Sequence, residues 1–226
     1  MKASLLSTAA ALVAGVFASP VPEDPRSDYT RREPAVPRQA SDTANEFLEG
    51  GCRDVIFIYA RGTTQDGNIG DAPGPQTIDL LKAALGDAAV AAQGVEYPAS
   101  LLDNLREGGC DPEDAEKMAA LITQAATECP DAQLVVSGFS QGAAMVHRSV
   151  EQLDTATAGR IAAGVTYGDT QKAQDNGGIP GLAADRTHII CHDGDLVCEG
   201  TLIVTEAHHG YENEAPEAVE FIVGKL

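Results

Sequence analysis

The sequence predicts an α/β fold in three layers, with a central, mostly parallel sheet flanked by helices. The continuous apolar run at residues 55–60 has the composition of a strand buried on both faces, and residues 161–167 are a further strand candidate. Segments with helical spacing of apolar residues lie between such runs, and strands that alternate with helices pair in parallel through crossover connections. A Gly-x-Ser-x-Gly pentapeptide at 138–142 lies at one of the strand-to-helix boundaries.

The first predicted elements are a strand at 55–60 and, after a loop rich in Gly, Thr and Asp at 61–75, a helix at 78–85. A short strand is predicted at 94–98, where Pro98 ends it. The clearest boundary is at Asp111, which can cap a helix that has Pro112 at its first position and extends to about residue 128.

The second half of the chain continues the alternation. Strands are predicted at 134–137, 161–167 and 187–191, with one helix starting after Ser140 and a terminal helix at 217–223. No repeat or second domain is evident, so a single domain is expected.

The N-terminal region has the pattern of a segment removed during secretion. Residues 1–18 combine Lys2, an apolar stretch and small residues near their end, as in a signal peptide. Residues 19–32 are rich in proline and charge and end in Arg31-Arg32, which predicts a pro-segment; a disordered tail is the alternative. The domain would then span residues 33–226 of a secreted, extracellular protein, since no later segment is apolar enough to cross a membrane.

The chain is strongly acidic, with a formal net charge of -19. A protein that binds nucleic acid neutralises phosphates with Lys and Arg, so this charge argues against a nucleic-acid partner. It also argues against binding to anionic membranes.

Five cysteines in a secreted chain predict disulfides and one remaining thiol, although the sequence leaves the pairing open. Cys191 and Cys198 are close enough for a local bridge. Cys52 precedes a strand and Cys129 follows a helix, so a bridge between them would close a long loop and stabilise the fold by a few kcal/mol, about 2–5. Cys110 is then either a buried structural thiol or an exposed one that links two chains.

The pentapeptide around Ser140 has the features of a nucleophile elbow. A serine on a sharp turn between a strand and a helix has an exposed Oγ, and small residues at 138 and 142 allow the turn to pack against neighbouring backbone. The start of the following helix directs N–H groups to where an oxyanion would form. The alternative is an ordinary Gly/Ser turn.

A serine nucleophile needs a histidine base and a carboxylate that orients it, in the chain order Ser, acid, His. His147 lies two turns into the helix, His188 lies in a strand and His192 precedes the acid. The remaining pair, His208 and His209, lies in a polar loop near the C-terminus, where a catalytic histidine is expected; two surface histidines are the alternative.

The candidate acid is Asp195, because the short loop between Cys191 and Cys198 would hold its carboxylate in place. Asp193, two residues earlier, is the main rival.

With these motifs, the chain resembles the fungal cutinases, small lidless serine esterases of the α/β-hydrolase fold. The resemblance covers the region from about Gly51 to the C-terminus and continues past Cys198 through Gly200, 202–204 and His208. Its main matching stretches are 54–63, 129–132, 138–143, 184–187 and 194–198.

Position by position, the resemblance implies that Ser140 is the nucleophile, His208 the general base and acid, and Asp195 the residue that fixes the imidazole tautomer. His208 is preferred to His209 because it keeps the family's spacing after Cys198. The implied oxyanion hole consists of the backbone N–H of Gln141 with the N–H and hydroxyl of Thr63.

The resemblance also implies substrate-binding residues and disulfides. Asn104 would steady the hydroxyl of the oxyanion-hole threonine, and Leu101, Leu202 and Ile203 would contact the acyl chain from two apolar loops. The implied bridges are Cys52–Cys129 and Cys191–Cys198, the same pairs that their positions suggest.

The implied activity is hydrolysis of cutin, the plant cuticle polyester, and of short-to-medium acyl esters through an acyl-enzyme. No metal or organic cofactor is expected, and a monomer without stable membrane insertion is expected. The alternatives are an acetylxylan esterase and a secreted, non-catalytic interaction protein on the same scaffold. The chain departs from the family pattern at His209, where an apolar residue is usual, at the extra Cys110, and at Thr63, where serine is commoner.

Overall fold

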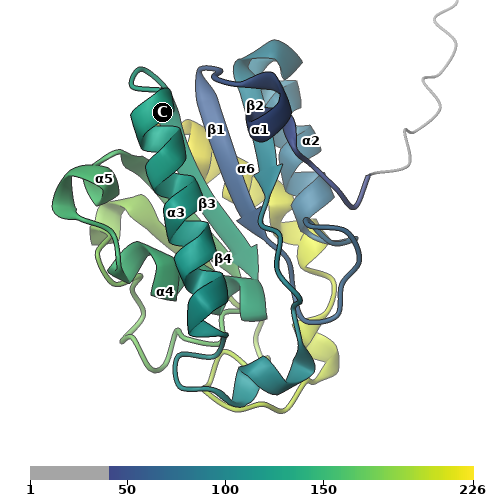
Figure 1. Ribbon diagram of the computed structural model, residues 1–226. Coiled ribbons are helices and arrows are strands. Elements are labelled where there is room, and N and C mark those ends of the chain that lie inside the picture. Colours follow the sequence, from purple (N-terminus) through teal and green to yellow (C-terminus); the bar gives the residue numbers. More distant parts are fainter. Residues whose placement is uncertain (1–40) are drawn as a thin grey trace, which may run out of the picture. The chain divides into compact units, whose positions relative to one another are not determined.

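The computed structural model describes residues 41–226; the predicted signal peptide and pro-segment lie outside the described residues. Five strands alternate with helices along this part of the chain (Figure 1). The strands are β1 (Val55–Ala60), β2 (Val90–Gly94), β3 (Gln133–Phe139), β4 (Ile161–Tyr167) and β5 (Thr187–Ile190). The α-helices are α1 (Glu46–Gly50), α2 (Gly74–Leu85), α3 (Pro112–Glu128), α4 (Gln141–Glu151), α5 (Thr155–Gly159) and α6 (Ala215–Val223).

The five strands form one parallel sheet in the order β2-β1-β3-β4-β5. This confirms the predicted parallel sheet. From β1 the chain proceeds to the β2 edge, whereas from β3 it proceeds toward the β5 edge, so β1 and β3 flank a topological switch point. Loops diverge at the carboxyl ends of such strands, and ligands of open α/β sheets bind there.

Helices cover both faces of the sheet, which gives the predicted three layers (Figure 1). Alternate residues of β1 enter opposite cores, because successive side chains of a strand point to opposite faces. Ile56 and Ile58 pack with residues of α3 and α4, including Met118 on α3. Phe57 packs on the other face with residues of α2 and α6.

Local signals place several elements where the sequence predicts them. Helix α3 begins after Asp111, whose Oδ1 accepts a hydrogen bond from the Glu113 N–H at 2.9 Å, with Pro112 in the first turn. Strand β4 has the predicted bounds. Helix α2 begins at Gly74, four residues earlier than predicted, because proline at position 75 is compatible with a first helical turn.

The strand predicted at 94–98 is displaced toward the N-terminus. The ladder between β1 and β2 covers Val90–Gly94, and the next residue, Val95, still donates its N–H to the Tyr59 carbonyl at 2.9 Å. This strand contains small residues such as Ala91 and Ala92, which have a weak β-propensity but fit a position that is buried on both faces.

Two disulfides are present, Cys52–Cys129 and Cys191–Cys198, with sequence separations of 77 and 7 residues. The first ties the segment before β1 to the end of α3. Cys110 is a free, buried thiol, and burial raises its pKa to about 12. Its environment therefore favours the interpretation of Cys110 as a buried structural thiol.

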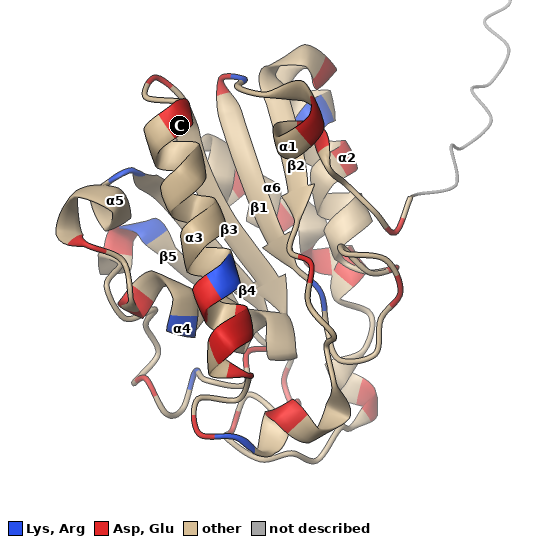
Figure 2. Cartoon of the chain, in the orientation of Figure 1, with Lys and Arg blue, Asp and Glu red and all other residues tan. Residues whose placement is uncertain are grey.

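Acidic residues lie on many helices and loops, while basic residues are fewer and scattered (Figure 2). Among the described residues, no helix combines the length and apolar character needed to cross a bilayer. The same residues contain no group of three or more His, Cys, Asp or Glu side chains arranged to hold a metal ion.

Candidate active site

Ser140 lies at the sharp turn between β3 and α4. Its backbone has φ 56° and ψ -117°, a conformation that non-glycine residues rarely adopt and that is found at strained functional positions. The two glycines of the pentapeptide are required by close backbone contacts. A Cβ on Gly138 would lie 2.2 Å from the Gly142 carbonyl oxygen, and one on Gly142 would lie 1.9 Å from the Ala60 carbonyl oxygen. The turn is therefore packed directly against the end of β1.

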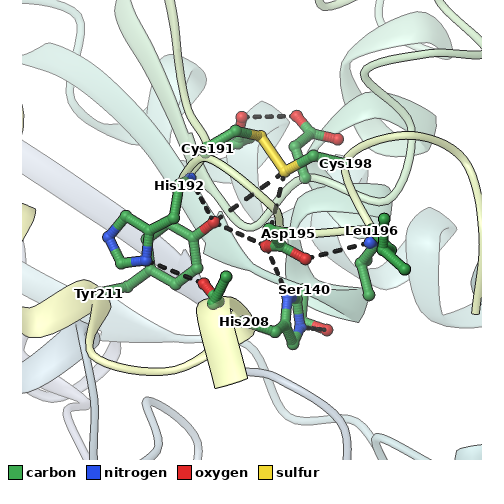
Figure 3. The surroundings of a disulfide bond; sticks show 12 residues. Ser140, Cys191, His192, Asp195, Leu196, Cys198, His208 and Tyr211 are labelled. Atoms are coloured by element: carbon green, nitrogen blue, oxygen red, sulfur yellow. Dashed lines mark hydrogen bonds and ion pairs between the residues drawn. A yellow bond between two sulfur atoms is a disulfide. The ribbon is translucent and has the colours of Figure 1, made fainter. Parts of the chain in front are cut away.

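The structure brings together Ser140, His208 and Asp195, the three residues proposed from the sequence. The Nε2 of His208 lies 2.9 Å from the Oγ of Ser140, and its Nδ1 lies 2.8 Å from the Oδ2 of Asp195. Asp195 and His208 are buried, with 1% and 4% of their surfaces exposed. Figure 3 shows these side chains beside the Cys191–Cys198 disulfide, which closes the loop that carries Asp195.

Asp195 is held in its ionised form by hydrogen bonds. Burial alone would raise its pKa, but bonds from Tyr211 and His208 and the Val197 N–H outweigh that effect, and the pKa is lowered. The Tyr211 hydroxyl donates to Oδ2 at 2.7 Å, and the Val197 N–H donates to Oδ1 at 3.0 Å. An ionised carboxylate at this position favours the imidazole tautomer with its proton on Nδ1, which leaves the His208 Nε2 free to accept the Ser140 proton.

The His208 ring is enclosed by neighbours on two sides. Phe139 stacks on it at a centroid distance of 5.1 Å, and a Cβ on Gly168 would approach its Cε1 to 2.8 Å. Gly168 has φ 52°, so both the conformation and the space favour glycine there. The imidazole is thus fixed by packing as well as by hydrogen bonds.

Thr63 follows the end of β1, and Gln141 follows the end of β3. The Nδ2 of Asn104 donates to the Thr63 Oγ1 at 3.0 Å, and Asn104 lies on a 3-10 turn at Leu101–Leu105. Gln141 is the first residue of α4, so its N–H is one of the orphan donors of a helix N-terminus. Its side chain donates to the Ser100 carbonyl at 2.8 Å and so connects α4 to the turn that carries Asn104.

An open cleft of about 800 Å³ lies over Ser140. Apolar side chains on two loops form its rim, and most are highly exposed, up to 71% for Leu105. Of the three residues predicted to contact the acyl chain, Leu101 and Leu202 line the cleft. Ile203 is exposed but is not part of the lining. The apolar rim residues that line it are Leu101, Leu102, Leu105, Leu202 and Val204.

The rival candidates lie elsewhere. Asp193 is exposed, whereas Asp195 is buried beside His208. His209 is an exposed residue of the cleft lining, which makes that part of the rim more polar. His188 contacts Glu217, 2.8 Å away, and His147 is buried between two aspartates.

Several residues of the site lacked a sequence signal. Tyr211 follows the histidine pair by two residues, but nothing in its position predicts a bond to Asp195. Leu102, Leu105 and Val204 neighbour residues that were predicted, and an apolar residue in a loop does not by itself indicate a cleft lining.

The parallel sheet, the strained serine at its switch point and the attached histidine and aspartate define this chain as an α/β hydrolase. The family model named Cutinase matches residues 51–226. The chain belongs to the cutinase family and is a carboxylic ester hydrolase.

Curated relatives support this assignment over most of the chain. The protein is 60% identical over 184 residues to Cutinase CUT2 of Pyricularia oryzae, which covers 81% of this chain and 86% of the relative. It is 38% identical over 219 residues to Cutinase 3 of Emericella nidulans, covering 96% of each. Cutinase 1 of Fusarium vanettenii is 44% identical over 196 residues, with coverage of 84% and 85%.

Solved structures agree on the fold. A Trichoderma reesei cutinase in complex with a phosphonate inhibitor is 36% identical, with a TM-score of 0.74 and coverage of 82% of this chain and 80% of that one. An acetylxylan esterase structure is 18% identical with a TM-score of 0.61, covering 77% of this chain and 99% of that one, so it shares the fold alone.

Proposed function

We propose that the protein cleaves aliphatic polyesters of the cutin type, and short-to-medium acyl esters, by a Ser140–His208–Asp195 triad. The observation that carries the proposal is the continuous hydrogen-bonded series from Asp195 to Ser140 at the base of an open, apolar-rimmed cleft. The names of the related cutinases support the same substrate class.

In the first half of the reaction, His208 Nε2 takes the proton of Ser140 as Oγ attacks the ester carbonyl. The Gln141 N–H and Thr63 stabilise the oxyanion, where a single donor is worth about 3 kcal/mol. Asn104 restrains the Thr63 hydroxyl through the 3.0 Å bond, so that this donor is oriented before the reaction.

In the second half, His208 protonates the leaving alcohol, and a water molecule then releases the acyl group from Ser140. The apolar rim suits an aliphatic acyl chain, because burial of each CH₂ contributes about 0.8 kcal/mol. An open cleft also suits a polymer, which cannot enter an enclosed pocket.

We infer further that the protein acts outside the cell, after removal of residues 1–18 and 19–32. Two disulfides in a domain of this size support an oxidising compartment. Mass measurement of the protein recovered from culture medium tests this: an N-terminus after residue 32 is expected, and retention of the intact chain inside cells contradicts it.

Hydrolysis of p-nitrophenyl esters of increasing acyl length tests the function, with Ser140→Ala as the control. A preference for chains longer than acetate, abolished by the substitution, is expected, and release of monomers from a cutin film then tests the polymer. Turnover of acetate alone would favour a carbohydrate deacetylase. No turnover by the correctly bridged protein would favour a non-catalytic role, and turnover that survives Ser140→Ala would overturn the site.

A further inference from the structure

Tyr211 lies next to the triad but has no part in the chemistry described above. We propose that Tyr211 is a positioning residue, whose hydroxyl fixes the Asp195 carboxylate and whose ring is held in place by His192. This inference rests on the proposed function, because it assigns Tyr211 a role only if Asp195 orients a catalytic His208.

The Asp195 carboxylate has three donors, and Tyr211 provides the shortest bond. Its hydroxyl donates to Oδ2 at 2.7 Å, the same oxygen that the His208 Nδ1 contacts at 2.8 Å. The Val197 N–H holds Oδ1 at 3.0 Å. Donors on both oxygens prevent rotation of the carboxylate. Without Tyr211, Oδ2 would depend on His208 alone, which is the residue that it has to orient.

The direction of the hydrogen bond follows from its partners. An ionised carboxylate can only accept, so the Tyr211 hydroxyl is the donor. The backbone N–H of His192 donates to the same hydroxyl at 3.0 Å, which occupies a lone pair and leaves the proton for Asp195. Burial, together with the Asp195 bond, raises the pKa of Tyr211, so the phenol keeps that proton throughout the working range of an esterase.

The Tyr211 ring is clamped between aromatic neighbours. The His192 imidazole is stacked on it, with centroids 4.0 Å apart and an angle of 4° between the ring planes. Figure 3 shows the two rings beside the triad. Phe139 packs against it at 5.6 Å. Only 1% of the surface of Tyr211 is exposed. The ring therefore cannot move the hydroxyl away from Asp195 without disturbing the core beneath the site.

His192 links Tyr211 to the backbone beside His208. Its Nδ1 lies 2.9 Å from the carbonyl oxygen of Ala207, the residue that precedes His208. Its Nε2 lies 3.2 Å from Glu214 on the 3-10 turn Tyr211–Glu214. The titratable groups around the Tyr211 hydroxyl are thus Asp195, His192, His208 and Glu214. Tyr211 bonds Asp195, and His192 bonds the backbone beside His208. Because the two rings stack on each other, together they hold both members of the Asp195–His208 pair.

The test is Tyr211→Phe, which keeps the ring and removes the hydroxyl. Tyr167→Phe is a matched control, because Tyr167 is equally buried and its hydroxyl bonds Thr77 on α2, 2.8 Å away, rather than the triad. We expect Tyr211→Phe to lower kcat at least about tenfold with little change in KM, since a hydrogen bond to a charged group is lost. Tyr167→Phe should keep kcat while losing comparable thermal stability.

The pH profile separates positioning from a general loss of stability. Removal of the donor makes the Asp195 carboxylate more basic, so it favours the imidazolium form of the pair, and the acid limb of kcat/KM should move to higher pH. A fluorinated tyrosine at position 211 is a more acidic and stronger donor, and should move the limb to lower pH. This second variant keeps the packing and remains informative if Tyr211→Phe folds poorly.

Equal kcat and equal pH profiles for Tyr211→Phe and Tyr167→Phe would overturn the inference, as would shifts of the acid limb in the same direction for the two substitutions at position 211. Ser140→Ala in the same assay distinguishes the two proposals. Activity that survives Ser140→Ala overturns the proposed function, whereas activity lost in Ser140→Ala but unchanged in Tyr211→Phe overturns only the role of Tyr211.

Discussion

Two histidines of this chain have nearly the same bonding distances but different partners: His208 contacts Ser140, which precedes α4, and His147 lies within α4. His208 contacts Asp195 through Nδ1 at 2.8 Å and Ser140 through Nε2 at 2.9 Å. His147 contacts Asp175 through Nδ1 at 2.7 Å and Asp169 through Nε2 at 2.9 Å. The difference between the second partners, a hydroxyl and a carboxylate, determines what each imidazole can do.

A hydroxyl can either donate or accept, so His208 can be neutral with a free lone pair on Nε2. A carboxylate only accepts, so both nitrogens of His147 have to donate, and this ring is an imidazolium that cannot act as a base. Burial would lower the pKa of His147, but Asp169 and Asp175 outweigh it and raise the pKa. A His–Asp contact alone is therefore no evidence of catalysis; the group on the other nitrogen decides.

The cluster formed by His147, Asp169 and Asp175 holds two parts of the fold together. Asp169 accepts bonds from the Thr166 hydroxyl at 2.6 Å and the Gln171 N–H at 2.8 Å, and Asp175 pairs with Arg148. The cluster joins α4 to the loop that follows β4. His147 and Asp169 are both fully buried, outside contact with solvent.

The largest effect is expected at His208, the proposed catalytic base. His208→Gln keeps a side chain of similar length that can donate to Asp195 but cannot accept the serine proton. Ester turnover should fall at least about 10³-fold, with little change in the midpoint of thermal unfolding. Measured kcat and calorimetry on the same sample check this. Substantial turnover by this variant would mean that His208 is not the base, and the partner on the second nitrogen would then not distinguish the two histidines.

His147→Gln should have the opposite effect. It removes the positive charge between the buried Asp169 and the partly buried Asp175, and breaking a buried ion pair costs about 3–5 kcal/mol of unfolding free energy. Turnover measured well below the unfolding transition should be largely retained. Urea unfolding monitored by circular dichroism gives the first quantity and ester hydrolysis the second. If turnover were lost while the stability stayed the same, His147 would belong to the catalytic machinery.

The two clusters also differ in how far the sequence predicts them. The strand-turn-helix motif locates Ser140, because the chemistry of the elbow restricts the residues that can occupy it. Chain order narrows the base to His208 or His209, and the family's spacing after Cys198 selects His208. The short disulfide loop contains both Asp193 and Asp195, so the preference for Asp195 came from the family resemblance, and the structure places Asp195 beside His208 and leaves Asp193 exposed. Asp169 and Asp175 lie in an irregular loop without periodicity, so nothing in the sequence indicates that they enclose His147.

The same limit applies to the fold and the rim. Strands with β-branched residues, such as β4, are found at the predicted bounds, while the alanine-rich β2 is not, because its stability comes from burial between neighbours rather than from local propensity. Ile203 does not line the cleft, although Leu202 and Val204 on either side of it do. Which residues of this loop line the cleft becomes visible only when the loop's position is known.

The smallest expected effect is a divergence between the pH dependence of stability and that of activity. His147 binds its proton more tightly in the folded protein, so its stabilisation is complete below about pH 6.5, the ordinary pKa of imidazole, and is lost as the pH rises through the higher folded value. Burial would raise the pKa of Asp169, but its bonds to His147 and Thr166 lower it. Its contribution is therefore present above about pH 4 and is lost as the pH falls through the lower folded value.

The cluster should therefore stabilise most between about pH 4 and 6.5, whereas activity should rise with pH as imidazole loses its proton. The unfolding free energy of the native protein minus that of His147→Gln, measured in urea from pH 5 to pH 9, should decrease by about 1.4 kcal/mol for each unit by which folding raises the His147 pKa. A difference that stays constant or grows with pH would mean that His147 is neutral in the folded protein. The two histidines would then share one protonation state, and their partners alone would not separate a base from a structural ion pair.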